Sequence, residues 1–457
     1  MALANKIALI TGASSGIGLA TAKLFAKNGC KVAATGRNEA ALNKLVQEIS
    51  TNSKAAVSVL NSMSTESKNN LLIKATKNIH QSRKKILLAN NLDVEDALSN
   101  SKDDAFVDRL RLDDERIDGI IDTLNNIVKL PDPIGTILDT WKRPNGLEIS
   151  RVRTPLGTIG IIFESRPNVS ADASALSIKS GNAVVLRSGS DSLRSSQAIV
   201  NCFEDALSDM NLPKGIVQII PIKDREMVTH MLKGLDGAID VIVPRGGKSL
   251  VQAVQDSATI PVFGHLEGIC HTYIDKSADL NTSISVVTNA KMRRPGICGA
   301  LETLLIHKDS SEQLSGILDS LIGAGCEIRG CEKTVKLDHR VTQANDIDWD
   351  TEYLSPILSI KIVDDIKQAV EHIQIHGTGH TDVIISEDKN SQDHFINQLD
   401  SAILMINASS QFADGGEFGM GGEIGIATGK FHARGPVSLE QLTSFKYVVR
   451  GSGQTRS

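Results

Sequence analysis

Cys298 is the one thiol of the chain whose neighbours indicate a chemical role. It follows a Pro-Gly pair that ends the helix-like pattern of 280–291, and it precedes the apolar, strand-like run of 301–306. A thiol on such a turn can face a cleft, and Arg293 and Arg294 would favour the nucleophilic thiolate. On its own the stretch is equally compatible with a small, buried core cysteine.

Further residues that could form a binding or catalytic site lie next to predicted strands. Asn168 follows the apolar run of 158–163, and Glu352 precedes that of 357–362. The other strand-end candidates are Arg187, Ser188, Gly189 and Ser190 after the run of 183–186, and Arg245, Gly246 and Gly247 after that of 241–243. Because buried runs alternate with helix-length segments, we expect a parallel sheet whose strand ends carry the site.

Two other regular elements are predicted around this sheet. From residue 51 the pattern turns helical, with Leu71, Leu72, Ala75 and Ile79 on one face. A hairpin is expected further on, with strands over 136–138 and 147–152 that flank the turn-forming Arg143-Pro-Asn-Gly146.

The spacing of His372, His376 and His380 could indicate a metal site on one helix face. Gly377 and Gly379 would break the helix that this spacing requires. We therefore predict no metal site.

The first 50 residues form a separate pattern, a strand that runs into a glycine-rich turn with Gly12, Gly16 and Gly18. This opening resembles the start of a short-chain dehydrogenase, and Arg37 would suit a 2'-phosphate. The catalytic Tyr-x-x-x-Lys of that family is absent, because none of the chain's three tyrosines has a lysine four residues later. Two parallel strands are marginal alone, so we expect an appendage without dehydrogenase activity.

Composition limits the classes of partner. The net charge of -5 lacks the basic footprint that nucleic acid or an anionic membrane requires. No apolar run approaches the ~20 residues of a membrane span, and the start lacks a signal-peptide layout. Six cysteines without CxxC pairs or metal spacing fit a reducing compartment. We predict a cytoplasmic protein that binds small molecules.

From about residue 55 onward the chain resembles the gamma-glutamyl phosphate reductases of the aldehyde dehydrogenase superfamily. The motifs that carry the likeness are 155–169, 180–187, 243–247, 290–303 and 432–436. The resemblance implies an α/β, aldehyde dehydrogenase-like fold with two doubly wound parallel-sheet domains, a small β oligomerisation element and a homo-oligomeric assembly. The expected divisions are a fragment over 1–50, a cofactor domain over 51–272 with the hairpin at about 135–153, a catalytic domain over 273–410, and a C-terminal segment over 411–457 that returns to the cofactor domain and the oligomer interface.

The resemblance also implies roles for the candidate residues. Cys298 would be the nucleophile, with the Asn168 amide and the Cys298 N–H as oxyanion hole. Arg187, Ser188, Gly189 and Ser190 would lie at the adenosine ribose, Arg245, Gly246 and Gly247 at the diphosphate, Glu352 at the nicotinamide ribose, and Arg294 at the leaving phosphate. NAD-preferring relatives carry a glutamate where Ser190 stands, so its absence favours NADPH.

The implied reaction is NADPH-dependent reduction of L-glutamyl 5-phosphate to L-glutamate 5-semialdehyde through a cysteine thioester, in proline biosynthesis. No kinase segment is visible, so a separate glutamate 5-kinase, as a transient partner, would supply the acyl phosphate. Three alternatives remain: a non-phosphorylating aldehyde dehydrogenase with Glu267 activating water, a short-chain alcohol dehydrogenase, and a non-catalytic nucleotide-binding protein. Cys270 is the rival thiol.

Overall fold

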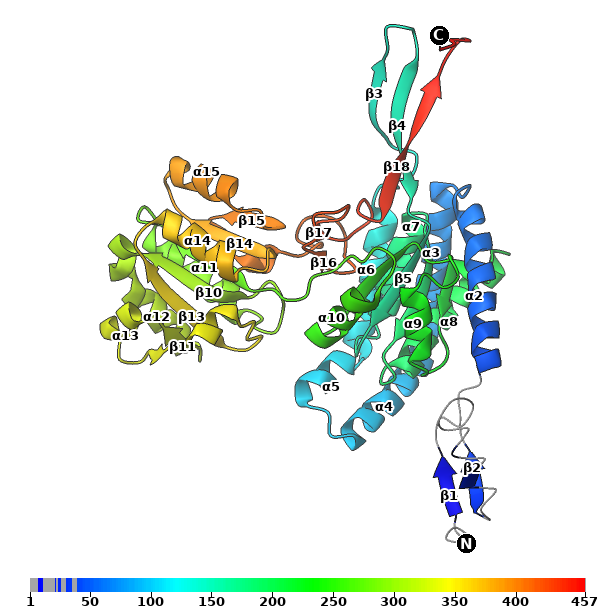
Figure 1. Ribbon diagram of the computed structural model, residues 1–457, viewed down its shortest axis with the longest axis horizontal. Helices are drawn as coiled ribbons and strands as arrows, with labels where there is room; N and C mark the ends of the chain where they lie inside the picture. The colour runs from blue at the N-terminus through cyan, green and yellow to red at the C-terminus, as the bar shows by residue number, and fades with distance from the viewer. Residues whose placement is uncertain (1–6, 11–20, 22–23, 26–29, 35–38, 457) are drawn as a thin grey trace.

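The computed structural model describes residues 7–10, 21, 24–25, 30–34 and 39–456. Two α/β bodies lie side by side, and a narrow β arm projects from one end of the first body (Figure 1). Each body is built around a parallel sheet, which confirms the predicted fold class. Within the described ranges, no helix is long and apolar enough to cross a membrane.

The first body holds a four-stranded sheet in the order β7-β6-β5-β8. Its strands are β5 (Thr158–Phe163), β6 (Ala183–Ser188), β7 (Val217–Ile219) and β8 (Val241–Arg245). Every residue of β5 and β6 is buried, which is why both read as continuous apolar runs rather than alternating ones. β7 is the shortest of the four strands, with three residues.

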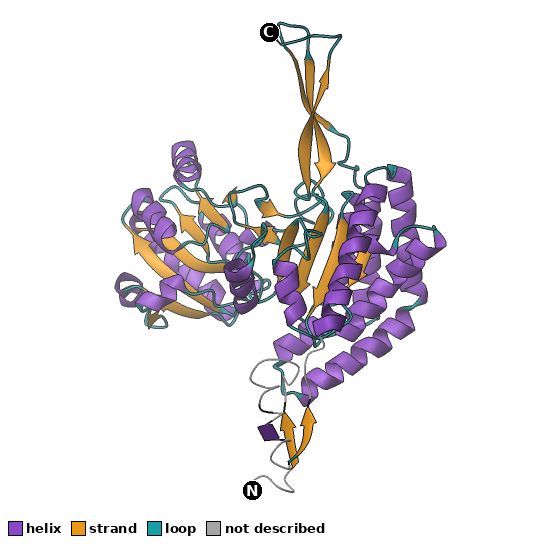
Figure 2. Ribbon diagram, turned by 45° about the vertical axis from the view of Figure 1, so that its right-hand side comes forward, coloured by secondary structure: helices purple, strands orange, loops and turns teal. Residues whose placement is uncertain are grey.

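Helices cover both faces of this sheet (Figure 2). Because successive side chains of a strand point to opposite faces, Ile161 packs in one core and Ile162 in the other. The first core includes residues of α3 (Thr65–Gln81), α6 (Asp114–Lys129), α7 (Val169–Lys179) and α8 (Leu193–Asp209). The second includes residues of α2 (Glu39–Leu60), α9 (Glu226–Leu232) and α10 (Lys248–Ser257).

The helical segment predicted from residue 51 is confirmed. Leu71, Leu72, Ala75 and Ile79 of α3 are all fully buried. Between α3 and α6 lie α4 (Arg83–Ser99) and the short α5 (Asp104–Leu110). Acceptor side chains cap these helices where the chain turns: Ser64 starts α3, Asp103 starts α5 and Asp113 starts α6.

Helix α2 connects the N-terminal segment to the first body. It runs without a break from Glu39 to Leu60, so the boundary expected at residue 50 falls inside one helix. Leu42, Val46 and Ile49 are buried against the sheet. β1 (Ile7–Ile10) and β2 (Lys31–Ala34) are parallel and pair with each other. The glycine-rich turn and Arg37 lie outside the described residues.

The second body holds a seven-stranded parallel sheet in the order β12-β11-β13-β10-β9-β14-β15. The strands are β9 (Cys270–Ile274), β10 (Leu301–His307), β11 (Glu327–Gly330), β12 (Thr342–Gln343), β13 (Ile357–Val363), β14 (Thr381–Ile385) and β15 (Ile403–Ile406). The helices are α11 (Leu280–Met292), α12 (Leu314–Gly323), α13 (Glu332–Leu337), α14 (Ile366–His376) and α15 (Lys389–Gln398).

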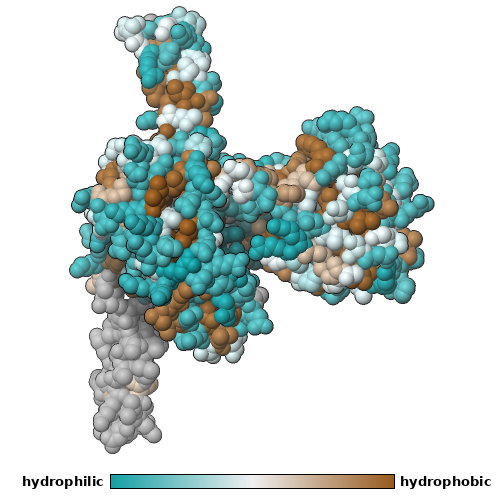
Figure 3. Space-filling model, turned by 180° about the vertical axis from the view of Figure 1, so that it is seen from behind, coloured by the Kyte–Doolittle hydropathy of each residue, from teal (hydrophilic) through white to brown (hydrophobic). Residues whose placement is uncertain are grey.

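The arm contains the predicted hairpin. β3 (Ile137–Lys142) and β4 (Glu148–Pro155) pair in antiparallel fashion, and β18 (Thr443–Arg450) adds a third strand from the C-terminal segment. Before β18, the chain forms the two short strands β16 (Ile426–Ala427) and β17 (Gly435–Pro436). Apolar side chains are exposed on the arm (Figure 3), among them Tyr447 and Phe445. The oligomeric assembly remains a prediction.

Candidate active site

Cys298 lies in the loop between α11 and β10, on the predicted turn, and is partly exposed. The segment before β9 runs against this loop so closely that a Cβ at Gly268 would lie 2.1 Å from the Cys298 carbonyl oxygen. Only glycine can occupy that position without displacing the loop.

The rival thiol, Cys270, is fully buried beneath the same loop. Its Sγ lies 3.2 Å from the Cys298 carbonyl oxygen, to which it donates a hydrogen bond. Burial, with nearby carboxylates and Cys298, raises the pKa of the Cys270 thiol well above its usual value. Cys270 therefore supports the loop, and Cys298 is the thiol that faces the cleft.

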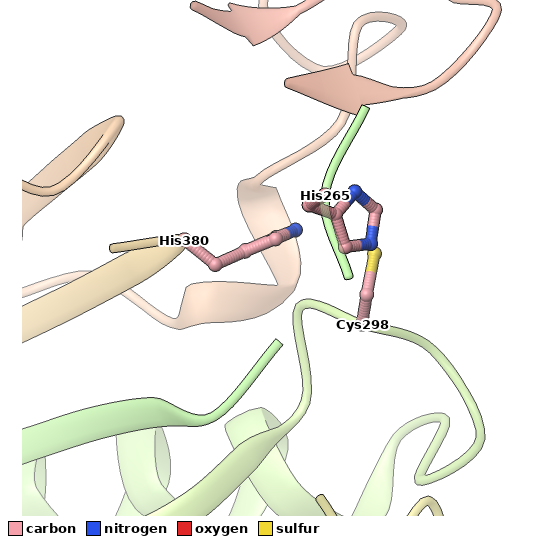
Figure 4. A group of neighbouring side chains, drawn as sticks. All are labelled: His265, Cys298 and His380. Atoms are coloured by element: carbon pink, nitrogen blue, oxygen red, sulfur yellow. The ribbon is translucent and has the colours of Figure 1, made fainter. Parts of the chain in front are cut away.

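Two histidines flank Cys298: His265, from the segment before β9, and His380, from the segment before β14 (Figure 4). One ligand atom from each of the three residues lies within 4.8 Å of the others. Burial alone would raise the pKa of Cys298, but the two imidazoles outweigh it and hold that pKa well below the usual range. Sequence analysis missed both residues in this role.

These three residues are the one group in the described part of the chain whose ligand atoms lie close enough together that they could hold a metal ion. The sequence triplet is not such a group, because α14 ends at His376 and Gly377 caps it. His380 lies beyond the break and reaches Cys298 instead. The expected effect of the glycines on the helix is thus confirmed.

A cleft of about 310 Å³ opens beside Cys298. Four of the residues predicted to bind the cofactor line this cleft: Arg245, Gly246, Gly247 and Glu352. Glu352 accepts a hydrogen bond from the Gly268 N–H at 2.9 Å. The structure therefore brings together the residues expected at the diphosphate and at the nicotinamide ribose.

The residues expected at the adenosine ribose do not line this cleft. Arg187 and Ser188 are buried at the end of β6, where the Arg187 guanidinium donates to the Ser188 carbonyl. Gly189 packs against the end of β5, and its N–H donates to the Phe163 carbonyl at 2.7 Å. Ser190 is exposed. Their assignment to the cofactor remains a prediction.

Two carboxylates near the cleft have distinct environments. Glu267, the residue that could activate water, is paired with Lys248 at 2.6 Å. Burial raises the pKa of Glu423 to about 7, although Arg245 opposes the shift, and the charge of Cys298 adds to it. Sequence analysis did not identify Glu423.

The loop between α11 and β10 carries Cys298, the predicted nucleophile, and is called the catalytic loop below. A second cleft of about 750 Å³ adjoins this loop. Asn168 and Arg294 line this cleft rather than the first, while Arg109, Arg166, Gly296 and Ile297 line both. The Asn168 Nδ2 donates to Asp172 at 3.0 Å, which leaves its second amide hydrogen available. Burial raises the pKa of Asp172 to about 6, with this hydrogen bond opposing the shift.

Known proteins resemble most of this chain in sequence and in fold. A gamma-glutamyl phosphate reductase of Brucella suis is 55% identical over 414 residues, which are 90% of this chain and 98% of the relative. That of Brucella anthropi is 54% identical over 413 residues, with 90% and 97% covered. The crystal structure of a gamma-glutamyl phosphate reductase from Thermotoga maritima superimposes with a TM-score of 0.88 at 43% identity, and covers 90% of this chain and 100% of that one.

Two family models match parts of the chain. The aldehyde dehydrogenase family matches residues 338–448. The short-chain dehydrogenase model matches residues 6–109, a range that extends past the N-terminal fragment into α5.

Proposed function

Because the chain belongs to the gamma-glutamyl phosphate reductase family, we propose that it reduces L-glutamyl 5-phosphate to L-glutamate 5-semialdehyde with NADPH, through a thioester on Cys298. The reduction itself is the family's reaction and a step of proline biosynthesis. The observation that carries the mechanistic proposal is the partly exposed Cys298, which has a lowered pKa, lies between two imidazoles and lines a cleft.

The first step of the proposed mechanism is formation of the thioester. His265 or His380 takes the proton of Cys298, and the thiolate attacks the acyl carbon of the acyl phosphate. Negative charge develops on the acyl oxygen, where the Cys298 N–H and the free amide hydrogen of Asn168 donate. The C–O bond to phosphate then breaks, and phosphate leaves as a stable anion, with Arg294 as a candidate to bind it.

The second step reduces the thioester. The cofactor would be held in the cleft beside Cys298 by Arg245, Gly246, Gly247 and Glu352. This placement would put the dinucleotide diphosphate at the N-terminus of α10. When bound, NADPH supplies the hydride that converts the thioester to a thiohemiacetal. Cys298 then leaves as the thiolate that the imidazoles stabilise, and the aldehyde is released.

The preference for NADPH rests on the loop after β6. The glutamate that NAD-preferring relatives carry is replaced by the exposed Ser190, which cannot repel a 2'-phosphate. Arg187 would add positive charge near this loop, although its guanidinium donates to the Ser188 carbonyl.

A phosphate-dependent reverse assay on glutamate 5-semialdehyde, run with NADP and NAD side by side, tests the proposal. Acid formation without phosphate would favour a non-phosphorylating aldehyde dehydrogenase, but the pairing of Glu267 with Lys248 speaks against a water-activating carboxylate. Binding of NADPH without turnover would favour a non-catalytic protein. The proposal has three further parts. The transient partner would be a glutamate 5-kinase, the chain would form a homo-oligomer through the arm, and the protein would be cytoplasmic.

A further inference from the structure

We propose that Arg109, Arg111, Arg166 and Arg294 form the anion-binding site of the cleft on the side of the catalytic loop that carries Asn168. This inference rests on the proposed function and names the side chains that hold its substrate. Arg166 and Arg294 bind the phosphate, and Arg109 and Arg111 bind the carboxylate at the other end of the glutamyl chain.

The four residues come from separate parts of the chain and converge on one cleft. Arg109 and Arg111 lie at the C-terminal end of α5, Arg166 lies in the loop between β5 and α7, and Arg294 lies in the catalytic loop. Sequence analysis identified Arg294 alone, because the other three are distant from it along the chain.

These arginines are not used to stabilise the fold. Within the described residues, none of their four side chains has a hydrogen bond, an ion pair or a ring contact. Arg116, which lines the same cleft, shows the alternative: it binds the Asp108 carboxylate at 2.6 Å and the carbonyl of Arg111 at 2.7 Å. A guanidinium offers five donors, so four unused side chains in one cleft are a preformed site for an anion.

The charges around Arg166 support this view. Burial lowers its pKa to about 10, and the repulsion of Arg245, Arg109 and Arg294 adds to the effect. The one neighbour that acts in the opposite direction is Cys298. A bound anion would relieve this repulsion next to Cys298, with which Arg166 interacts.

The division between phosphate and carboxylate follows from position. The phosphate is bonded to the carbon that Cys298 attacks, so its ligands must lie beside the catalytic loop. Arg294 is part of that loop, and Arg166 shares the first cleft with Cys298 and lies near enough for the two charges to interact. Arg109 and Arg111 come instead from the end of α5; Arg111 lines only the second cleft, and Arg109 lines both.

The reverse reaction can test this division, because phosphate and glutamate 5-semialdehyde are then separate substrates with separate KM values. We expect Arg166→Gln and Arg294→Gln to raise the KM for phosphate about tenfold or more, the scale of one lost charged hydrogen bond. Arg109→Gln and Arg111→Gln should raise the KM for the semialdehyde instead. Arg293→Gln is the matched control, since Arg293 adjoins Arg294 but does not line the cleft. The KM for NADP should stay unchanged in Arg111→Gln, Arg294→Gln and Arg293→Gln, because none of these three residues lines the cofactor cleft.

A binding measurement separates this inference from the proposed function. In a Cys298→Ser background, phosphate should raise the melting temperature, and Arg166→Gln should abolish that shift. Unchanged KM values and an unchanged phosphate shift in the four cluster variants would overturn the inference, even if the parent enzyme is active. If the parent shows no phosphate-dependent activity, the proposed function fails, while the melting shift still decides whether the arginines bind the anion.

Discussion

The Nδ1 atom of His265 lies 2.7 Å from the main-chain oxygen of Ile426. A carbonyl can only accept a hydrogen bond, so Nδ1 carries the proton and Nε2 is left as the acceptor. In Figure 4 one ring nitrogen of His265 lies next to the Cys298 sulfur. The C-terminal segment thus sets the tautomer in which His265 can take the thiol proton.

We expect His265→Ala to raise the pKa of Cys298 toward that of a free thiol. In the parent, the lowered pKa lets the thiolate form at a lower pH than in a free thiol; in the variant, the thiolate would form only at higher pH. The rate of alkylation by iodoacetamide, followed against pH, should show its midpoint shift upward, and turnover at pH 7 should fall in parallel. His339→Ala, an exposed position, is the control. An unchanged midpoint would assign the thiolate to His380 alone.

Cys298→Ser should lose nearly all turnover and retain NADPH binding, because a hydroxyl at neutral pH is a far weaker nucleophile than a thiolate. Cys270→Ser should keep substantial activity, since Cys270 donates to the loop backbone and is fully buried. Turnover and NADPH fluorescence titration measure the two properties. The opposite pattern, an inactive Cys270→Ser with an active Cys298→Ser, would reverse the assignment of the nucleophile.

Ser190→Glu should erode the preference for NADPH over NADH by placing a carboxylate beside the 2'-phosphate. A change of about tenfold or more in the ratio of kcat/KM values is the scale expected when a charge opposes a phosphate. Because Ser190 is exposed, the substitution should not alter the melting temperature. Equal efficiency of the parent with both cofactors would remove the basis of this prediction.

Deletion of residues 1–38 should leave reductase activity and stability close to those of the parent. β1 and β2 pair only with each other among the described strands, so their removal breaks no sheet of the two bodies. A deletion of residues 1–50, at the boundary expected from sequence, should instead lower the free energy of unfolding. It removes Leu42, Val46 and Ile49, and each buried side chain of this kind contributes ~1.5–3 kcal/mol.

Urea unfolding of both truncated chains measures the difference, with turnover as a second readout. Equal stability of the two chains would show that the first turns of α2 are dispensable. Loss of turnover after the shorter deletion, in a chain that stays folded, would show that the N-terminal strands serve the reductase.

Glu302→Gln should lower the free energy of unfolding by about 3–5 kcal/mol, because it leaves the charge of Lys291 buried without a partner. The two side chains are fully buried and their Nζ and Oε2 atoms lie 2.5 Å apart. The other Glu302 oxygen accepts from the Leu354 N–H, so the pair also holds the segment that carries Glu352. Glu332→Gln, which breaks the exposed pair with Lys336, should cost less than about 1 kcal/mol. Equal effects in urea unfolding would contradict the argument.

Local patterns were sufficient to predict the regular elements. The burial of β5 and β6 on both faces requires apolar runs, and the Pro-Gly pair before Cys298 places the thiol on a turn, so these features could be read from neighbouring residues. The family resemblance supplied the order of these elements and the role of Cys298. Helix α2 shows the limit of such reading, because a change of sequence pattern at residue 50 does not end a helix whose apolar face continues.

The sequence by itself therefore determined the α/β class, the turn that carries Cys298, and four further residues of the cleft beside it, Arg245, Gly246, Gly247 and Glu352. Tertiary structure alone decided that His265 and His380 flank Cys298, and that His265 contacts the Ile426 carbonyl, 161 residues further along the chain. It also decided the gathering of Arg109, Arg111 and Arg166 with Arg294. Spacing along the chain reports neighbours within one helix or strand, whereas contacts between strand ends and loops depend on how whole elements pack.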